Sequence, residues 1–492
     1  CYFCNKNIIL KNMKKTKIVA TIGPSSDSIE VIKSLIIEGV NVFRLNFSHG
    51  SHEYHQSTIT KIKEASNSLG IRVGILQDIC GPKIRVGALK EPFELKAGDR
   101  LNVLKESIIG HKNGEIYELS INQPQILSLL KEGEYIYLYD GMIKAKVIKC
   151  LPDMIETVIE NDGILSSNKG VNFPNTKLNI DVITQKDRAD MLWGAQNRVD
   201  FVAISFVQNA NDIINARAIL KEFDSTAKIF AKIEKFDAVE NIDSIIEASD
   251  GIMVARGDLG IEVPYYKVPT IQKLIIKKAN AANRPVITAT QMMLSMAKSQ
   301  SATRAEISDV ANAVLDGTDA VMLSEESAVG INPVAVVKAM SATIVQSELI
   351  YPYGKFDEFE FADETDMVAS ASSHLAQRIG ANAIISITSS GSSAIKMARN
   401  RPTMPIIAVT HDESVARSLT IVWGVTPSLV VPQNQLNLLL ANTIKGLKDA
   451  NLISDEATYT LTAGYPTGKI GSTNYIRILR KEQIKYYLNE VK

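Results

Sequence analysis

Eight short apolar runs constrain most strongly what this chain can fold into. Most of them are continuous rather than alternating, as expected for strands of a parallel sheet that is buried on both faces. The intervening segments include stretches with helical periodicity, which predict amphipathic helices at residues 28–38, 210–221 and 268–282. The apolar runs occupy residues 17–22, 42–47, 72–77, 201–205, 228–233, 251–255, 285–288 and 320–323.

Eight such units predict an α/β fold of the (β/α)8 TIM-barrel type. The chemistry of a barrel of this kind lies at the C-terminal ends of its strands. A doubly wound sheet is the structural alternative. The length of 492 residues indicates roughly three domains, so the barrel is expected to account for only part of the chain.

The segment between residues 78 and 200 is too long for a loop of such a barrel. It shows little helical period, and Asn-Gly and Asp-Gly turn signals separate its strand-like runs. The run at residues 143–148 alternates apolar residues with lysines, which is typical of a strand with one solvated face. We therefore predict a small, β-barrel-like domain inserted at residues 83–180.

The alternation of strands and helices starts again after residue 350. An acidic, aromatic connector at residues 352–366 precedes predicted helices at 367–379, 393–400 and 414–419 and predicted strands at 383–388, 406–410, near 428–431 and at 458–462. This pattern predicts an open α/β domain. The expected organisation is an extension at 1–12, the barrel at 13–82 and 181–350, the inserted domain at 83–180 and the C-terminal domain at 351–492.

Charge and cysteine content exclude several classes of protein. The chain has 54 basic and 54 acidic residues, which argues against a globally basic nucleic-acid binder. No apolar run approaches the ~18 residues of a membrane span. Four cysteines cannot form a disulfide framework, so a cytoplasmic location is expected. Cys1 and Cys4 lack a second pair at zinc spacing, and residues 1–12 are expected to be a disordered extension before Met13.

The carboxyl ends of the predicted strands carry an unusual set of polar side chains. In a barrel these positions share one mouth, and stability alone gives little reason to gather carboxylates and cations there. They are Arg44, Asn46, Ser48 and His49 at the end of the second run, Asp78, Lys83 and Arg85 after the third, Lys232 and Glu234 at the end of the fifth, Asp258 after the sixth, Thr290 after the seventh, and Ser324 and Glu326 after the eighth.

These residue types indicate a site for a metal ion and a phosphorylated anion. Glu234 and Asp258 supply hard oxygen ligands from neighbouring strands, which suits Mg²⁺ or Mn²⁺. Lys232 lies two residues before Glu234 and shares its strand face, where it can stabilise developing negative charge. Arg44 and Arg85 add further positive charge for a phosphate. A buried network of ion pairs without catalytic function is the alternative.

Five motifs, taken together, closely resemble the pyruvate kinase family, in order from about Lys14 to the C-terminus. The resemblance implies a barrel with an inserted lid and an effector-binding α/β domain, assembled as a homotetramer. It also implies a cytoplasmic glycolytic enzyme that transfers the phosphoryl group of phosphoenolpyruvate to ADP, giving pyruvate and ATP. The motifs are Thr21-Ile22-Gly23-Pro24-Ser25-Ser26, the run from Arg44 to Gly50, Lys232-Ile233-Glu234, the run from Met253 to Gly260, and Ala289-Thr290-Gln291-Met292.

The resemblance assigns roles at the predicted mouth. It implies that Lys232 stabilises the phosphoryl group in flight, that Thr290 organises protonation of the enolate and that Ser324 continues the proton relay. The implied contacts with phosphoenolpyruvate come from Arg44, Lys232, Gly257, Asp258 and Thr290; the implied Mg²⁺ ligands, which would also accept Mn²⁺, are Glu234 and Asp258; the implied nucleotide-binding residues are Asn46, Ser48, His49, Arg85 and Lys169.

One departure from the family concerns a monovalent cation. Many members hold K⁺ with residues that match Asn46, Ser48 and Asp78, and they carry glutamate in a Gly-Pro-Glu-Ile-Arg motif. Here the motif has Lys83 in place of the glutamate. We expect its ammonium group to replace K⁺, because two cations in one small site repel each other by roughly 4 kcal/mol at ~4 Å and an effective dielectric of ~20. In the alternative, Lys83 points into solvent and K⁺ still binds.

A second departure concerns the effector. Many members carry Ser-Gly-Arg-Ser in the phosphate loop of the C-terminal domain, whereas this chain lacks the arginine. The remaining hydroxyl and backbone N–H groups still predict a site for a phosphorylated effector, and fructose bisphosphate, another sugar phosphate and AMP all stay open. The loop comprises Thr388, Ser389, Ser390, Gly391, Ser392 and Ser393.

Two other functions are compatible with a barrel that carries these residues. Metal-dependent aldol lyases and mutases that handle phosphoenolpyruvate also stabilise enolates at the mouth of a barrel, but they need neither ADP nor a lid. A non-catalytic scaffold on a degenerate barrel would be expected to have lost Lys232, Glu234 or Asp258, and all three are present. An assay with and without ADP separates the enzymatic alternatives.

Overall fold

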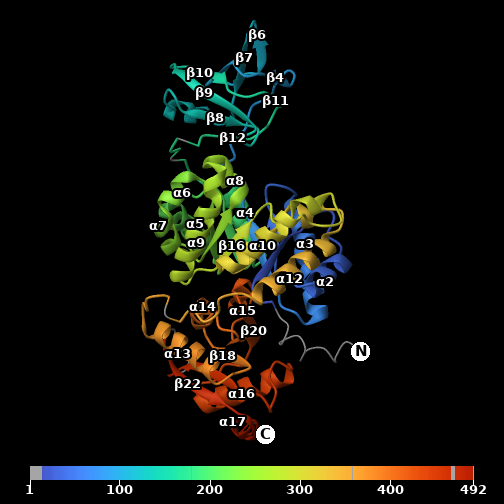
Figure 1. Cartoon of the computed structure of the whole chain (residues 1–492), viewed down its shortest axis with the longest axis vertical. Helices are drawn as coiled ribbons and strands as arrows, with labels where there is room; N and C mark the ends of the chain where they lie inside the picture. Colours follow the sequence, from blue (N-terminus) through green and yellow to red (C-terminus); the bar gives the residue numbers. More distant parts are fainter. Residues whose placement is uncertain (1–13, 175, 179, 357, 467–470, 491–492) are drawn as a thin grey trace.

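A closed barrel of eight parallel strands forms the centre of the computed structural model (Figure 1). The structure describes residues 14–174, 176–178, 180–356, 358–466 and 471–490, so the predicted extension and the Cys1–Cys4 pair lie outside the described residues. The order around the barrel is β1-β17-β16-β15-β14-β13-β3-β2, which confirms the (β/α)8 prediction over the doubly wound alternative. The strands are β1 (Lys17–Thr21), β2 (Val42–Asn46), β3 (Gly74–Asp78), β13 (Phe201–Ile204), β14 (Lys228–Ile233), β15 (Gly251–Ala255), β16 (Val286–Ala289) and β17 (Ala320–Leu323).

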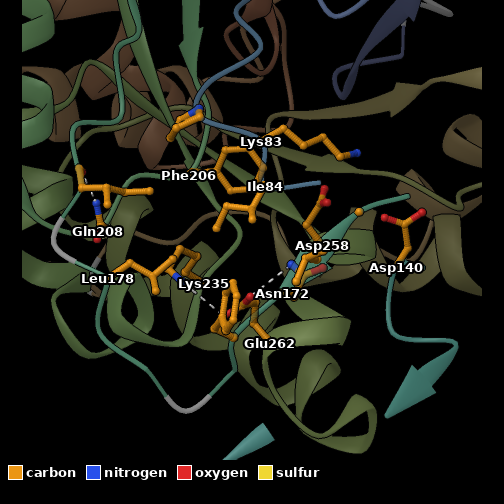
Figure 2. Close-up of a pocket in the computed structure, with 15 residues that line it drawn as sticks. Lys83, Ile84, Asp140, Asn172, Leu178, Phe206, Gln208, Lys235, Asp258 and Glu262 are labelled. Carbon is orange, nitrogen blue, oxygen red and sulfur yellow. Dashed lines mark hydrogen bonds and ion pairs between the residues drawn. The ribbon is translucent and has the colours of Figure 1, made fainter. Parts of the chain in front are cut away.

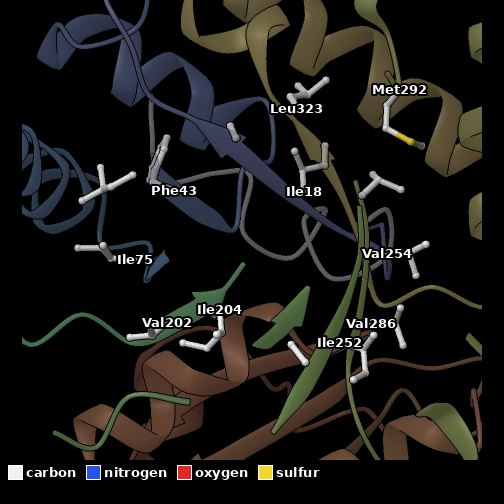
Figure 3. Close-up of a cluster of buried hydrophobic side chains, with 14 of the residues drawn as sticks. Ile18, Phe43, Ile75, Val202, Ile204, Ile252, Val254, Val286, Met292 and Leu323 are labelled. Carbon is white, nitrogen blue, oxygen red and sulfur yellow. The ribbon is translucent and has the colours of Figure 1, made fainter. Parts of the chain in front are cut away.

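Helices surround these strands and supply the outer half of the hydrophobic core. Ile18, Phe43 and Val254 are fully buried in this core (Figure 3). Several helices begin at reciprocal caps, such as Thr184 and Thr303, whose hydroxyls accept a backbone N–H of the first turn. The barrel helices are α2 (Ile29–Ile37), α3 (His52–Leu69), α4 (Gln185–Gln196), α5 (Ala210–Glu222), α6 (Phe236–Glu240), α7 (Ile242–Ala248), α8 (Arg256–Glu262), α9 (Val268–Ala281), α10 (Arg304–Asp316), α11 (Glu325–Ala328) and α12 (Pro333–Glu348), with short 3₁₀ turns η2 (Tyr265–Lys267) and η3 (Leu294–Ala297).

A separate β-rich region interrupts the barrel between β3 and β13, and Figure 1 shows it beyond one end of the barrel. It has a seven-stranded sheet in the order β12-β8-β9-β10-β5-β7-β6 and a two-stranded sheet of β11 and β4. The alternating prediction for the run at 143–148 holds, because buried and exposed residues alternate along β9. The elements are β4 (Phe93–Leu95), β5 (Arg100–Leu104), β6 (His111–Asn113), β7 (Ile116–Ser120), η1 (Pro124–Leu129), β8 (Tyr135–Leu138), β9 (Ile143–Cys150), β10 (Met154–Ile159), β11 (Gly163–Leu165) and β12 (Val171–Asn172).

Two paired chain segments connect this inserted domain to the barrel. Arg85 and Gly170 form an antiparallel bridge. The N–H of Val86 donates to the carbonyl of Lys169 at 2.9 Å, and the N–H of Val171 donates to that of Ile84 at 3.0 Å. We call residues 84–86 and 169–171 the hinge ribbon. Since its two halves are hydrogen-bonded to each other, the inserted domain leaves and rejoins the barrel at one place.

The C-terminal region forms a five-stranded sheet in the order β20-β19-β18-β21-β22, at the opposite end of the barrel in Figure 1. Its pairings are parallel except for the antiparallel pair β21–β22. This agrees with the predicted open α/β domain. The elements are α13 (Glu364–Arg378), β18 (Ala383–Ile387), α14 (Ser392–Arg399), β19 (Ile406–Thr410), α15 (Glu413–Ser418), η4 (Leu419–Ile421), β20 (Val425–Leu429), α16 (Leu436–Asp449), β21 (Tyr459–Gly464), β22 (Thr473–Leu479) and α17 (Lys481–Glu490).

Ion pairs with buried carboxylates join the C-terminal region to the N-terminal end of the barrel strands. Arg401, 1% exposed, donates to Asp319 at 3.0 Å and lies over the ring of Trp423. Arg417 donates to Asp200 at 2.7 Å. These ion pairs join residues of the barrel to residues of the C-terminal region, so the two regions pack through specific polar contacts as well as apolar ones.

No helix in the described part of the chain combines the length and apolar character needed to cross a membrane.

Candidate active site

Four charged side chains meet where β2, β3 and β14 end. The Arg44 Nε donates to the Asp78 Oδ2 at 2.7 Å. The Lys232 Nζ lies 3.1 Å from the Asp78 Oδ1 and 2.9 Å from the Glu234 Oε1. Cation and carboxylate therefore alternate from Arg44 to Glu234. The structure thus brings together four of the predicted residues, which come from the second, third and fifth strands.

Neighbouring polar groups fix both ends of the Lys232–Glu234 pair. Lys232 also donates to the Ser205 hydroxyl at 2.7 Å, and the Phe206 N–H donates to the Glu234 Oε2 at 2.7 Å. Asp78 and Glu234 are almost fully buried. Ser205 and Phe206, just after β13, were not among the predicted site residues, because no signal in their own segment marks them.

Burial and mutual attraction perturb the ionisation of these groups. Burial alone would raise the pKa of Asp78, but Lys232 and Arg44 more than offset it and hold that pKa below its ordinary value. Burial opposes the charge of Lys232, yet Asp78 and Glu234 raise its pKa above the ordinary value. Burial, reinforced by Asp258, raises the pKa of Glu234 despite Lys232. A fixed ammonium therefore lies between two carboxylates of unequal acidity.

The turn after β16 carries Thr290 in a strained conformation. Its φ of 68° lies in the left-handed region, which a β-branched residue rarely adopts. The Gly257 N–H donates to the Thr290 Oγ1 at 2.8 Å, and Arg256 donates to the Thr290 carbonyl at 2.6 Å. Arg256 is itself held by both carboxylate oxygens of Asp309, at 2.6 and 2.7 Å. The strained turn is thereby fixed against the first turn of α8, which also carries Asp258.

Ser324 lies at the end of β17, where Glu326 fixes the backbone. The Glu326 carboxylate accepts from the Ser324 N–H at 2.7 Å and from the Met293 N–H at 3.2 Å, and it is buried. Within the described residues, no hydrogen bond joins Ser324 to Thr290.

The residues predicted to bind a nucleotide fall into two groups. Asn46, Ser48 and His49 share the loop after β2, where the Asn46 side chain accepts from the Ser48 N–H at 3.1 Å. Arg85 lies in the hinge ribbon and donates to the Asn168 carbonyl at 2.9 Å, while Lys169 lies over the Tyr139 ring at 4.2 Å. No hydrogen bond or ion pair links the two groups over the part of the chain that is described. The first group belongs to the barrel and the second to the inserted domain.

Lys83 lines a cavity between the barrel and the inserted domain (Figure 2). In that view its ammonium group and the carboxylate of Asp258 extend toward the same side of the cavity, which Asp140 also lines. Among the described residues, Lys83 makes no ion pair, and no hydrogen bond joins it to Asn46, Ser48 or Asp78. The Asp78 carboxylate instead already has Arg44 and Lys232 as cationic partners.

The side chains available as ligands limit which metal ion the C-terminal end of the barrel can bind. The described residues contain no cluster of three or more His, Cys, Asp or Glu side chains arranged for a metal ion. The predicted ligands are two carboxylates, Glu234 and Asp258, which are close enough for Asp258 to raise the pKa of Glu234. Mg²⁺ characteristically uses one or two carboxylates together with substrate oxygens and water. The residues present therefore fit such an ion.

The predicted effector loop borders a polar cavity of about 240 Å³ in the C-terminal region. Thr388, Ser389, Ser390, Ser392 and Ser393 line it. Gly391 has a φ of 87°, a conformation that favours glycine, and its N–H donates to the Thr388 hydroxyl at 3.0 Å. Hydroxyl groups and the start of α14 thus face a space that admits a small ligand.

The chain is similar to known proteins over most of its length. Residues 13–337 match the family model "Pyruvate kinase, barrel domain", and residues 366–479 match "Pyruvate kinase, alpha/beta domain". The chain is 41% identical to the pyruvate kinase of Geobacillus stearothermophilus over 473 residues, covering 94% of this chain and 80% of that protein. It is 41% identical to that of Staphylococcus aureus MRSA252 over 479 residues, covering 95% and 80%.

A solved structure is similar over nearly the same extent. The crystal structure of a pyruvate kinase from Cryptosporidium parvum superposes with a TM-score of 0.90 at 36% sequence identity. The match covers 97% of this chain and 99% of the other. The similarity therefore includes the barrel, the inserted domain and the C-terminal region together.

Proposed function

The chain belongs to the pyruvate kinase family and is thus a phosphotransferase that converts phosphoenolpyruvate and ADP to pyruvate and ATP; we propose how its own residues carry out that reaction. The observation that supports the proposal best is the buried series of charges from Arg44 through Asp78 and Lys232 to Glu234 at the barrel mouth. Phosphoryl transfer depends mainly on positioning and on electrostatic stabilisation of the moving group, and this series offers both.

Glu234 and Asp258 are proposed to hold Mg²⁺, with Mn²⁺ as a substitute ion. When bound, the ion supplies a positive charge to substrate oxygens during transfer. Arg256 and Asp309 hold the α8 turn that presents Asp258. The Phe206 N–H and Lys232 orient the two oxygens of Glu234.

Arg44 and Lys232 are proposed to bind the phosphate of phosphoenolpyruvate. Lys232 stays protonated because Asp78 and Glu234 raise its pKa, so its charge is available to the phosphoryl group in flight and to the enolate. Gly257 and the Asp258 side chain are proposed to contact the substrate as well. Thr290 is proposed to organise protonation of the enolate carbon, and Ser324 to continue the relay to solvent.

The inserted domain is proposed to act as a lid over the nucleotide. Asn46, Ser48 and His49 would bind ADP from the barrel, while Arg85 and Lys169 would bring two cations from the hinge ribbon to its phosphates. Closure of a lid excludes water and completes the site. The hinge ribbon supports this role, because it connects the domain to the barrel at one place.

The enzyme is further proposed to work without K⁺. Asp78, which matches a K⁺ ligand of the family, is already paired with two cations in this chain. Lys83 adds a positive group to the cavity between the barrel and the inserted domain, where it extends toward the same side as Asp258. Its charge could serve the substrate phosphate as K⁺ does elsewhere in the family.

Regulation is proposed to depend on a phosphorylated effector that binds in the cavity beside Thr388–Ser393. A homotetramer is supported by exposed apolar side chains around α12, which a second copy would cover: Val329, Ile331, Leu349 and Ile350. Sedimentation of the native protein tests the assembly. Participation in glycolysis supports a cytoplasmic location, which cell fractionation tests.

The metal assignment is tested by pyruvate formation from phosphoenolpyruvate, ADP and Mg²⁺. Glu234→Ala and Asp258→Ala are expected to lose turnover while keeping the circular dichroism spectrum of the wild type. Glu240→Ala is the matched control, since that carboxylate is exposed and its ion-pair partner among the described residues is the surface residue Lys177. Near-normal activity of either site variant at limiting Mg²⁺ would refute the assignment. Turnover without ADP would instead favour the lyase or mutase alternative.

A further inference from the structure

Three chain segments meet at a buried carboxylate beneath the inserted domain. The Asn172 Nδ2, on β12 of the lid, donates to the Glu262 Oε1 at 3.2 Å. The Lys235 Nζ, just after β14, donates to the Glu262 Oε2 at 3.4 Å. Glu262 is the last residue of α8. Figure 2 shows the three side chains converging at the cavity between the lid and the barrel. Each oxygen of Glu262 is therefore occupied by a different segment.

Burial makes this arrangement sensitive to the loss of a partner. The side chains of Lys235 and Glu262 are only 6% and 3% exposed. A charge buried to this extent is costly unless a partner compensates it, and removing one partner leaves the other uncompensated. Asp237 also lies near, and burial together with Glu262 raises its pKa, although Lys235 opposes the shift. The Lys235–Glu262 pair is thus part of a compact charged cluster. This cluster favours one relative position of the end of α8 and the segment after β14.

The same two segments carry the proposed metal ligands. Lys235 follows Glu234 directly, and Glu262 lies four residues after Asp258 on α8, one helical turn away. A second lid residue approaches this helix, because a Cβ on Gly141 would lie 3.2 Å from the Ile261 side chain. The lid therefore rests on α8 at two places, and α8 cannot shift there without disturbing Asp258.

We propose that Glu262 is a positioning residue: it ties the lid, through Asn172, to the helix that presents Asp258, and Lys235 compensates its charge. The proposal rests on the assignment of Glu234 and Asp258 as metal ligands. It adds that the position of the lid and the position of a metal carboxylate are coupled. Substitution at Glu262 then changes both metal affinity and lid mobility, although Glu262 itself contacts neither metal nor substrate.

Three variants of the full chain separate the two connections. Glu262→Leu removes both, and its dissociation constant for Mn²⁺ alone, measured by electron paramagnetic resonance without substrate, is expected to rise about tenfold. Amide hydrogen exchange in β8 and β9 of the lid is expected to accelerate as well. Glu262→Gln keeps an oxygen for Asn172 and is expected to restore most of the lid protection. Asn172→Ala is expected to accelerate lid exchange with a smaller effect on Mn²⁺ affinity.

Asp319→Asn is the control for a merely structural effect. It breaks a similarly buried ion pair, with Arg401 at the foot of the barrel, and is expected to lower the melting temperature without changing Mn²⁺ affinity or lid exchange. The proposal is overturned if Glu262→Leu behaves like this control. If Glu262→Leu does not fold, the lid exchange of Asn172→Ala and Glu262→Gln decides. Failure of the wild type to bind Mn²⁺ would overturn the metal assignment, while lid exchange would still test the connection to α8.

Discussion

At the scale of single residues, the position of Lys232 is the main determinant of the candidate chemistry. Its ammonium group lies within 3.1 Å of one oxygen on each of Asp78 and Glu234. Such fixed charge needs no reorganisation when negative charge develops on a substrate. Sequence position predicted Lys232 and Glu234 on one strand face, but only the fold shows that Asp78 completes the series.

Replacement of Lys232 by methionine is expected to slow phosphoryl transfer by ~10²–10³, because one preorganised charged contact is lost. Exchange of the pyruvate methyl protons, followed by nuclear magnetic resonance, is expected to persist if Thr290 and the metal ligands remain in place. Lys228→Met, at the opposite end of β14, serves as control and should transfer normally. Rapid transfer by Lys232→Met would place Lys232 outside the reaction.

Substitution of Lys83 tests independence from K⁺. The initial rate of the wild type is expected to be the same in KCl and in tetramethylammonium chloride of equal ionic strength. Lys83→Glu restores the glutamate of the family motif and should acquire a requirement for K⁺. Lys90→Glu, an exposed charge reversal elsewhere in the inserted domain, controls for net charge. Large stimulation of the wild type by KCl would contradict the expectation.

At the scale of secondary-structure elements, burial decided which elements the sequence predicts well. The eight barrel strands lie within two residues of their predicted positions, because a strand buried on both faces is apolar throughout. Helix α3 spans 18 residues and was not predicted, because its sequence is mostly polar. Its ends are defined by the caps Ser51 and Gly70. Strand β22 was not predicted either. It is an edge strand next to β21, and most of its residues are only partly buried, so its hydrophobic pattern is weaker.

Two predicted boundaries in the C-terminal region were displaced. Helix α13 begins at Glu364 rather than at 367, because the Asp363 side chain caps it and accepts from the Asp366 N–H. Strand β20 spans Val425–Leu429, earlier than the predicted run near 428–431, because its pairing with β19 fixes the register. Caps and register depend on partners that a local pattern does not identify.

The candidate site also contains residues that the sequence predicts and contacts that it does not. Residues that follow a strand directly, such as Glu234 and Thr290, were predictable because all strands of a barrel end at one mouth. Contacts between distant segments were not, as in the bond from Asn172 to Glu262, which are 90 residues apart.

The effector loop offers a gain-of-function test. Ser392→Arg places an arginine where many family members have one, beside the cavity of Thr388–Ser393. We expect affinity for fructose bisphosphate, measured by calorimetry, to rise about tenfold, since a hydrogen bond to a charged group contributes about 1.5 kcal/mol. Ser454→Arg adds the same charge at an exposed position and should have no effect. Equal affinities in the two variants would argue against the loop as the phosphate site.

At the scale of the whole molecule, buried charges couple the barrel to the C-terminal region. Burial raises the pKa of Asp200 to about 6, although Arg417 opposes the shift. The native state therefore binds a proton more readily than the unfolded state, whose carboxyl keeps its ordinary pKa of 3.8. By linkage, the contribution of Asp200 to the free energy of unfolding falls as pH rises from about 4 to about 6.

This linkage predicts a pH-dependent difference between the wild type and Asp200→Asn. The wild type is expected to lose up to about 3 kcal/mol relative to the variant across that window, at about 1.4 kcal/mol per pKa unit. Above pH 6 the difference should stay constant. Urea midpoints of both proteins at several pH values measure it, and other titrating groups cancel in the comparison. A difference that does not change with pH would show that the pKa of Asp200 is the same in the native and unfolded states.

The paired ends of the inserted domain have a consequence for the order of folding. Strands β3 and β13 are neighbours in the barrel, although roughly 120 residues separate them along the chain. Once the hinge ribbon has formed, the effective loop between them shrinks to about 35 residues, which lowers the entropic cost of their pairing by about 1 kcal/mol. The inserted domain should then fold before the barrel closes. Pulse-labelling hydrogen exchange during refolding should protect β9 and β10 ahead of β3 and β13, whereas the reverse order would show that the barrel assembles across an open loop.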